Sequence, residues 1–275
     1  MTAIVELWSA DDQMRLERFL QAVESGEPLD AILALNRDSL AKLEEAIEEA
    51  RSTVEAAESF GGALAVAAAI GTVIESDWKI QLEPGDDLLA EGDLAKAFAT
   101  KLASPRTLAA LWTYTAKRLG YGAHWLEMNV FHPISVSDGS SEVLVDSTSG
   151  RLVSHADCRE IFHEVTDNSE TFLPEMFDPP TAREVASEVL ELRLAGASSS
   201  EDETVAYRNM RFHAALHQDK PRVVFAAALA AAKIGDHVFA TRTLKRLVVE
   251  AADTPIAEPA KQALERITQQ FQYTN

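Results

Sequence analysis

The strongest limit on the fold comes from a sharply bounded helix that leads directly into alternating strands. Ser104 can cap the N-terminus of this helix, and Pro105 suits the first helical position, where no backbone N–H is needed. Gly120 can end the helix in the left-handed conformation. One side of the segment carries mostly apolar side chains: Leu108, Leu111, Trp112, Thr115 and Leu119. The pattern therefore predicts a helix over residues 104–119 that covers an apolar surface.

Residues 123–153 change to the two-residue period of β-strands. Side chains alternate along the segment Trp125, Leu126, Glu127, Met128, Asn129, Val130 and Phe131. Asp138-Gly139 then separates two further apolar pairs, and this dipeptide is typical of a tight turn between antiparallel strands. A second turn at Thr148-Ser149-Gly150 precedes a short closing strand. One helix therefore leads into a small antiparallel meander.

Helical periodicity dominates the flanking regions. Most of residues 1–120 is expected to be helical, including an Ala-rich buried helix over residues 60–74. Ser154 and Asp157 predict a capping box for a helix that runs to about Val165. Four more helices are predicted after a small polar linker at Gly196-Ala197-Ser198-Ser199-Ser200: residues 204–218, 221–234, 238–251 and 259–271. Such helices are typical of tetratricopeptide-like repeats and also of a plain helical bundle.

The net charge argues against several classes of partner, and the single cysteine argues against an internal disulfide. The net charge is −19, and an acidic surface repels both nucleic-acid phosphates and anionic membranes. The longest apolar run, residues 60–74, is shorter than the about 20 residues that cross a bilayer, and no secretory signal is expected at the N-terminus. Cys158 stands alone and cannot form an internal disulfide. We therefore expect a cytoplasmic protein with a protein or peptide partner and with no nucleic acid or membrane partner; its oligomeric state stays open.

The order of helix, histidine strand and aspartate strand suggests a particular chemistry. In papain-like and transglutaminase cores, a cysteine at the helix start is activated by a histidine whose imidazole an aspartate orients. Here His132 and Asp146 follow the helix on successive strands. No cysteine stands at the helix start, where Arg106 occupies the nucleophile position. Arginine cannot act as the nucleophile, because its guanidinium stays protonated.

Several short motifs, taken in order, resemble the SirB-type transglutaminase-like family of bacteria. They are Pro105-Arg106-Thr107-Leu108-Ala109, Ala116-Lys117-Arg118-Leu119-Gly120, His132, Val145-Asp146 and Ala156-Asp157-Cys158. The resemblance covers about residues 85–270, and members of the family continue into tetratricopeptide-like helices. Three positions depart from the family pattern: Phe131 replaces glycine, Pro133 replaces phenylalanine and Ser147 replaces proline.

The resemblance implies an α+β fold. We expect a helix-rich transglutaminase-like, or papain-like, core with a small antiparallel sheet, followed by a tetratricopeptide-like helical region. The expected regions are an acidic helical part at residues 1–84, the core at residues 85–196 and the helical region at residues 201–275.

The same resemblance implies the fold more than the activity, because the family has usually lost the catalytic cysteine. We predict a non-catalytic protein-interaction or regulatory module whose binding groove lies between the helix and the strands. The residues expected to line this groove are Arg106, Trp112, Trp125 and His132. The enzymatic alternative is a residual amidase or acyl-transfer activity in which Thr107 is the nucleophile and His132 and Asp146 complete the triad. A purely structural role is the third possibility.

Two groups of histidines have spacings that metal sites use, but neither predicts a site. His155, Cys158 and His163 do not share one helix face. His213 and His217 are four residues apart and share a face, but they lack the glutamate of the His-Glu-x-x-His pattern. The sequence therefore predicts no metal and no cofactor.

Overall fold

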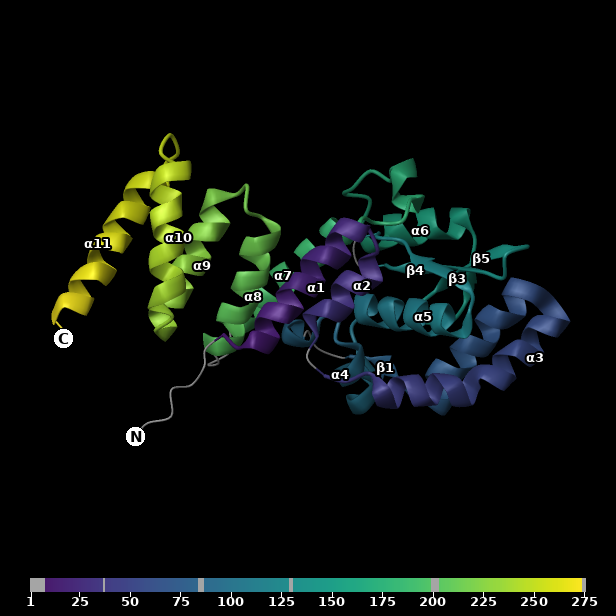
Figure 1. Ribbon diagram of the computed structural model, residues 1–275. Coiled ribbons are helices and arrows are strands. Elements are labelled where there is room, and N and C mark those ends of the chain that lie inside the picture. The colour runs from purple at the N-terminus through teal and green to yellow at the C-terminus, as the bar shows by residue number, and fades with distance from the viewer. Residues whose placement is uncertain (1–7, 37, 84–86, 129–130, 199–202, 274–275) are drawn as a thin grey trace.

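The N-terminal third of the molecule consists of three helices. The computed structural model describes residues 8–273 except 37, 84–86, 129–130 and 199–202 (Figure 1). The first elements are α1 (Ala10–Ser25), α2 (Pro28–Leu35) and α3 (Ala41–Thr72), the last of which continues into a π-helical turn at Val73–Asp77. A kink interrupts α3 at Gly61 and Gly62. Gly62 has a φ of +58°, and a Cβ there would lie 2.7 Å from Asp138, so the kink depends on glycine.

The segment α3 has the length and composition of a membrane-crossing helix. Residues Ala41–Asp77 pass this test, which core helices of non-membrane proteins pass as well. Val66, Ala67 and Ile70 are buried in the main hydrophobic core, where α3 packs against α5. The expected buried helix over residues 60–74 is thus part of a longer helix and is buried on one side only, since Phe60 is 91% exposed.

Two small sheets follow α3. The elements in this part are β1 (Gln81–Leu82), a 3-10 turn (Leu88–Ala90), α4 (Leu94–Thr100), β2 (Leu102–Ala103), α5 (Pro105–Leu119), β3 (Gly122–Trp125), β4 (Pro133–Ser137), β5 (Glu142–Asp146) and β6 (Leu152–Val153). The strands β3 to β6 form the predicted antiparallel meander in chain order. The alternating residues after Trp125 are not part of β3, however, and His132 directly precedes β4 rather than lying on a strand. The parallel pair of β1 and β2 was not expected, because two-residue strands are too short to show a period.

The helix α5 lies at the centre of the main core. Ser104 accepts a hydrogen bond from the Thr107 backbone, Pro105 is the first helical residue and Gly120 ends the helix with a φ of +98°. The predicted caps are therefore confirmed. Leu108 and Trp112 are 4% and 2% exposed, so the predicted apolar face is buried. The burial extends around the helix, because every residue from 106 to 116 is buried.

The outer face of the meander carries a smaller cluster of hydrophobic residues. It is covered by α6 (His155–Val165), which has the predicted capping box of Ser154 and Asp157, and by a 3-10 turn at Pro174–Phe177. Cys158 and Phe162 of α6 pack there against Leu126 and Met128. The sheet is thus enclosed between α5 on one side and α6 on the other.

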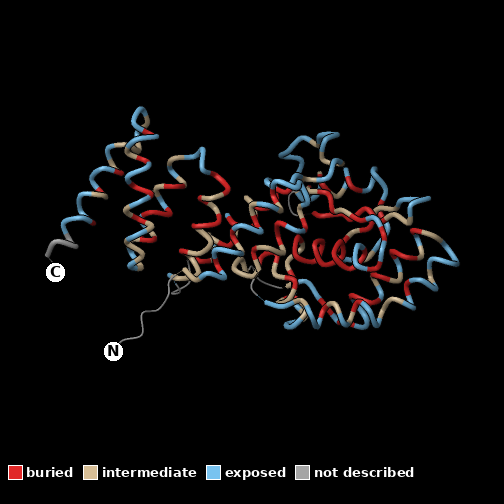
Figure 2. The backbone as a smooth tube through the Cα atoms, viewed as in Figure 1, coloured by how far each residue is buried: buried red, intermediate tan, exposed pale blue. Residues whose placement is uncertain are grey.

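Five helices form the rest of the chain and extend away from the sheet (Figure 1). They are α7 (Ala182–Ser198), α8 (Glu203–Leu216), α9 (Pro221–Ile234), α10 (His237–Glu250) and α11 (Ala257–Tyr273). Each helix packs on the next one, and buried residues follow the facing sides (Figure 2). A second core fills the array with small side chains such as Ala227, Ala231 and Ala240. The helix-rich α+β class is therefore observed, and a tetratricopeptide-like array is compatible with it.

The predicted linker and boundaries need correction in part. Gly196 to Ser198 belong to α7, while Ser199 and Ser200 lie outside the described residues. A Cβ on Gly196 would meet Leu88 Cβ and the Leu89 backbone nitrogen at 2.9 Å, so this glycine permits a close helix contact. The expected boundary at residue 84 lies outside the described residues. The main core includes residues on both sides of it, from α1 to α8.

Candidate functional site

The start of α5 is held by hydrogen bonds between hydroxyl groups and backbone. Ser104 Oγ donates to Thr107 Oγ1 at 2.8 Å and accepts from the Thr107 backbone at 3.1 Å. Thr107 Oγ1 also accepts from the backbone N–H of Gly92 at 2.9 Å. The Thr107 side chain is buried, and its oxygen ties the segment after the 3-10 turn to α5. Both hydroxyls therefore have structural partners.

Arg106 lies one position after Pro105 and extends into a cluster of three glutamates. Its Nη2 lies 2.9 Å from Glu127 Oε1 and 2.7 Å from Glu188 Oε2. Its Nη1 lies 3.7 Å from Glu91 Oε1. The side chains of Arg106 and Glu91 are 11% and 5% exposed. A buried guanidinium needs such compensation, because an unpaired charge is costly to remove from water.

Glu127 links this arginine to the predicted histidine. His132 Nδ1 lies 2.9 Å from Glu127 Oε1, and the Trp125 indole N–H donates to Glu127 Oε2 at 3.4 Å. Burial alone would raise the pKa of the Glu127 carboxyl, but the contacts with His132 and Arg106 outweigh it and lower the pKa to about 2. The half-buried Glu188 has a raised pKa, because burial outweighs the opposing charge of Arg106. Glu127 is therefore ionised at neutral pH and holds both neighbours.

Asp146 has a separate set of partners. Its carboxylate accepts hydrogen bonds from the Thr148 backbone at 2.9 Å, the Thr148 hydroxyl at 2.8 Å and the Ser149 hydroxyl at 2.5 Å. The strand register places Asp146 opposite Pro133, one position away from His132. Among the described residues, no hydrogen bond joins His132 to Asp146. The expected pair is not formed, because the turn after β5 uses the aspartate and Glu127 faces the histidine.

A comparison with models of protein families identifies the domain that contains this cluster. A model described as transglutaminase-like superfamily matches residues 37–191, which is more than half of the chain. The chain belongs to the transglutaminase-like superfamily. No curated protein and no solved structure matches it. The matched transglutaminase-like domain runs from the residues before α3 into α7 and leaves α8 to α11 outside.

The four residues expected to line a groove of the transglutaminase-like domain are all buried. Arg106 and His132 are 9% and 3% exposed and belong to the charged cluster. Trp112 borders a cavity of about 420 Å³ beside Ser147, whereas Trp125 borders a separate cavity of about 490 Å³ beside α2. The structure therefore does not bring the four side chains together in one open groove.

The lone cysteine of the transglutaminase-like domain lies away from the start of α5. Cys158 is fully buried in the cluster between α6 and the sheet. Burial, together with the charges of Asp157 and Asp146, raises the pKa of its thiol to about 11. The thiol is protonated at neutral pH, so it is a poor nucleophile.

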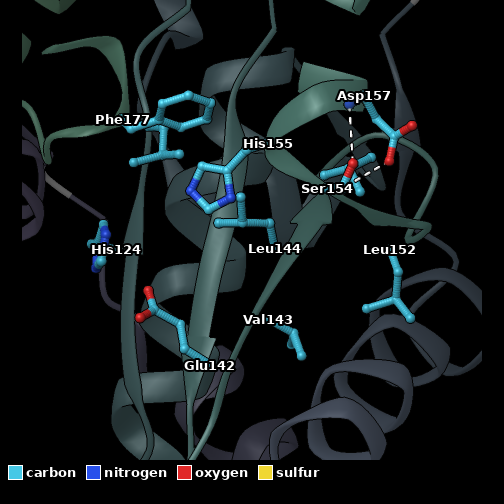
Figure 3. Close-up of a pocket in the computed structure, with 11 residues that line it drawn as sticks. His124, Glu142, Val143, Leu144, Leu152, Ser154, His155, Asp157 and Phe177 are labelled. Carbon is cyan, nitrogen blue, oxygen red and sulfur yellow. Dashed lines mark hydrogen bonds between the residues drawn. The ribbon is translucent and has the colours of Figure 1, made fainter. Parts of the chain in front are cut away.

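A further cavity also lies away from Arg106. It has a volume of about 560 Å³ and opens on the sheet face that α6 covers (Figure 3). His124 and Glu142 approach it from β3 and β5, while His155 and Phe177 form its other wall (Figure 3). Burial lowers the pKa of His124, although Glu142 opposes this shift. The cavity combines two carboxylates, Glu142 and Asp157, with two imidazoles, but it contains no residue of the Arg106 cluster.

Sequence reasoning missed the three glutamates that surround Arg106. Glu127 carries a visible signal, because it is the charged residue in a segment of mostly apolar side chains between β3 and β4. Glu91 and Glu188 carry no such signal, since they come from a turn and from a helix far along the chain. Only the packing of α7 brings Glu188 to α5.

Proposed function

We propose that this protein is a non-catalytic protein-interaction or regulatory module, built on a SirB-type transglutaminase-like core and acting in the cytoplasm. The observation that carries the proposal is the position of Arg106. Its guanidinium occupies the start of α5, where the chemistry needs a nucleophile, and is held by Glu127 and Glu188. A protonated guanidinium has no electron pair to attack a carbonyl carbon.

The hydrogen bonds of Thr107, beside Arg106, also favour a non-catalytic role. An imidazole that activates a nucleophile must face that nucleophile and be oriented from its other nitrogen. Here Glu127, in place of Asp146, contacts the Nδ1 atom of His132 as an orienting carboxylate does, while Asp146 is engaged in the turn after β5. It is therefore the nucleophile position that argues against catalysis. The enzymatic alternative requires Thr107 to donate its proton to His132. Thr107 Oγ1 accepts hydrogen bonds from Ser104 and Gly92, and among the described residues no hydrogen bond joins Thr107 to His132, which argues against that alternative.

The helical array offers the best-supported surface for a partner. A cavity of about 300 Å³ lies between α1, α8, α9 and α10, and three arginines line it: Arg211, Arg242 and Arg246. Arg211 is buried between the rings of Trp8 and Phe239, at 3.7 Å and 4.0 Å from their centroids. Arg211 is paired with Asp236 at 3.6 Å and Arg246 with Glu250 at 3.4 Å, whereas Arg242 makes no ion pair in the part of the chain that the structure describes. A basic cavity on a chain of net charge −19 is complementary to an acidic peptide, which we propose as the partner.

The absence of catalysis is tested with two reagents on the full chain. A thiol-directed activity probe should give no labelling that depends on folding, and a glutamine-donor substrate with a primary amine should give no product. Cys158→Ala serves as the matched control and should behave as the wild type. Turnover that Cys158→Ala abolishes would overturn the non-catalytic proposal.

The partner surface is tested with a fluorescein-labelled peptide of alternating glutamate and leucine residues. Binding measured by fluorescence anisotropy should weaken with added salt and fall by at least about tenfold in Arg242→Glu. Arg222→Glu, on the exposed start of α9, is the matched control and should bind as the wild type. Equal binding of the lysine–leucine counterpart, or equal loss in both variants, would contradict an acidic partner.

A further inference from the structure

A cluster of metal-ligating side chains lies between α7 and α8, outside the sites described above. Glu191 comes from α7, whereas His213 and His217 come from the end of α8. One ligand atom from each residue lies within 4.8 Å of the other two. His213 Nε2 is 3.7 Å from Glu191 Oε1, and the two imidazole rings are 4.8 Å apart at their centroids. Three potential ligand atoms from two packed helices therefore lie close together.

The donor set selects the class of ion. Two imidazoles and one carboxylate suit Zn²⁺ and neighbouring divalent transition metals, with a fourth position open to water. Ca²⁺ and Mg²⁺ prefer all-oxygen sites with more ligands. Ser187 adds a polar partner, because its hydroxyl lies 2.8 Å from His217 Nε2 and 3.1 Å from Glu191 Oε1. It can orient both ligands without binding the ion itself.

The surroundings of the two histidines, His213 and His217, fit metal binding. The His213 side chain is 14% exposed, and burial lowers the pKa of both His213 and His217. The buried Nε2 atom of His213 makes no hydrogen bond among the described residues. The nearby positive charges of Lys220 and Arg183 oppose binding of a cation, and Glu191 offsets them in part. The Glu191 side chain is 60% exposed, so an ion can enter from solvent.

We propose that Glu191, His213 and His217 bind one Zn²⁺-class ion, which clamps α7 to α8. The two helices are antiparallel, since Ser187 contacts His217 while Glu191 contacts His213. The two histidines therefore lie at and directly after the C-terminal end of α8, where they face the middle of α7. Glu191 is also the last residue of the matched superfamily domain. An ion here fastens the transglutaminase-like domain to the first helix beyond it.

The experiment is a titration of the full chain with ZnCl₂ after treatment with EDTA, followed by isothermal calorimetry. We expect one ion per chain. We also expect CoCl₂, used as a spectroscopic probe, to give visible ligand-field bands from nitrogen coordination. His213→Gln should weaken Zn²⁺ binding by more than the about 10–100-fold that is typical when only a hydrogen-bond partner of a ligand is lost. His155→Gln, on exposed α6, is the matched control and should bind as the wild type.

A second variant keeps the proposal falsifiable if His213→Gln disturbs folding. Glu191 is exposed, so Glu191→Gln should retain the circular-dichroism spectrum of the wild type while losing most of its Zn²⁺ affinity. Absence of Zn²⁺ binding by the wild type up to millimolar concentration would overturn the site. Binding that is unchanged in both folded Glu191→Gln and His217→Gln would overturn it equally.

Discussion

Two polar clusters that include residues of α7 differ in whether the chain itself supplies a positive charge. Glu188 and Glu191 are one helical turn apart, and each joins a cluster that packs α7 against another helix. Around Glu188, the chain supplies its own cation in the guanidinium of Arg106. Around Glu191, the chain supplies two imidazoles that burial keeps neutral. The first cluster is therefore complete in the folded chain, whereas the second has the donors of a site whose cation would come from solution.

The largest expected effect follows from removing the guanidinium of Arg106. Arg106→Met leaves Glu91 and Glu127 buried without their positive partner, which should cost about 3–5 kcal/mol of unfolding free energy. Arg118→Met removes a pair with Glu44 at the exposed end of the same helix and should cost at most about 1 kcal/mol. Urea unfolding measures both changes. Equal losses in the two variants would show that the Arg106 cluster is not a buried network.

The dependence of the unfolding free energy on acidic pH tests the ion pair between Arg106 and Glu127. The pKa of this carboxyl is about 2 in the folded chain, below its ordinary value of about 4.3 in an unfolded chain. Its ionised form therefore stabilises the fold above the unfolded pKa, and this contribution disappears as pH falls from about 4.3 to about 2. The loss should total about 3 kcal/mol. The raised pKa of Glu188 acts in the opposite direction.

The control for this titration is Glu127→Gln. Stability measured by urea unfolding between pH 2 and pH 5 should depend less on pH in this variant than in the wild type. An unchanged acid dependence would mean that other carboxyls dominate, and the ion network would lose its main energetic support.

Both clusters depend on the position of α7, which a smaller change can disturb. Gly196→Ala places a Cβ 2.9 Å from Leu88 Cβ and the Leu89 backbone nitrogen, which should cost about 1–3 kcal/mol. Gly122→Ala is the control, since its Cβ would meet Ser137 at an ordinary 3.4 Å. Thermal unfolding compares the two variants. A Gly196→Ala protein as stable as Gly122→Ala would show that α7 can shift freely.

The smallest expected effect concerns the two histidines of the Glu191 cluster, His213 and His217, near neutral pH. Because burial lowers the pKa of His213 and His217, the unfolded chain binds more protons just below pH 6.5. Stability should therefore fall modestly as pH decreases through this range, and the double variant His213→Gln/His217→Gln should reduce the slope. Added Zn²⁺ should stabilise the wild type more at pH 7 than at pH 5.5. The opposite slope would mean that the imidazoles carry charge in the folded chain.

Local features of the fold could be predicted because their causes are local. Ser104, Pro105 and Gly120 determine the ends of α5 through caps that involve only neighbouring residues. Asp138-Gly139 likewise determines the turn between β4 and β5. By contrast, the pairing of β1 with β2 depends on where α4 places two very short segments, which no period in the sequence reveals.

The candidate sites were less predictable, because their residues meet only through tertiary packing. The spacing of His213 and His217 is visible in the sequence, but the third ligand, Glu191, comes from another helix. The role of Asp146 was assigned from the order of strands. Its neighbours Thr148 and Ser149 favour a turn in which the carboxylate accepts local hydrogen bonds, and this local structure prevailed. Arg106 was placed correctly at the helix start, whereas its glutamate partners were not expected.

The central claim is that Arg106 and Glu127 form a coupled pair at the start of α5. A double-mutant cycle with Arg106→Met, Glu127→Gln and the combined variant measures this coupling directly from unfolding free energies. The distances predict a coupling energy of about 1–3 kcal/mol, because the contact is 2.9 Å and largely removed from water. A coupling energy near zero would show that the two charges act independently, and Arg106 would then not be fixed where the proposal requires it.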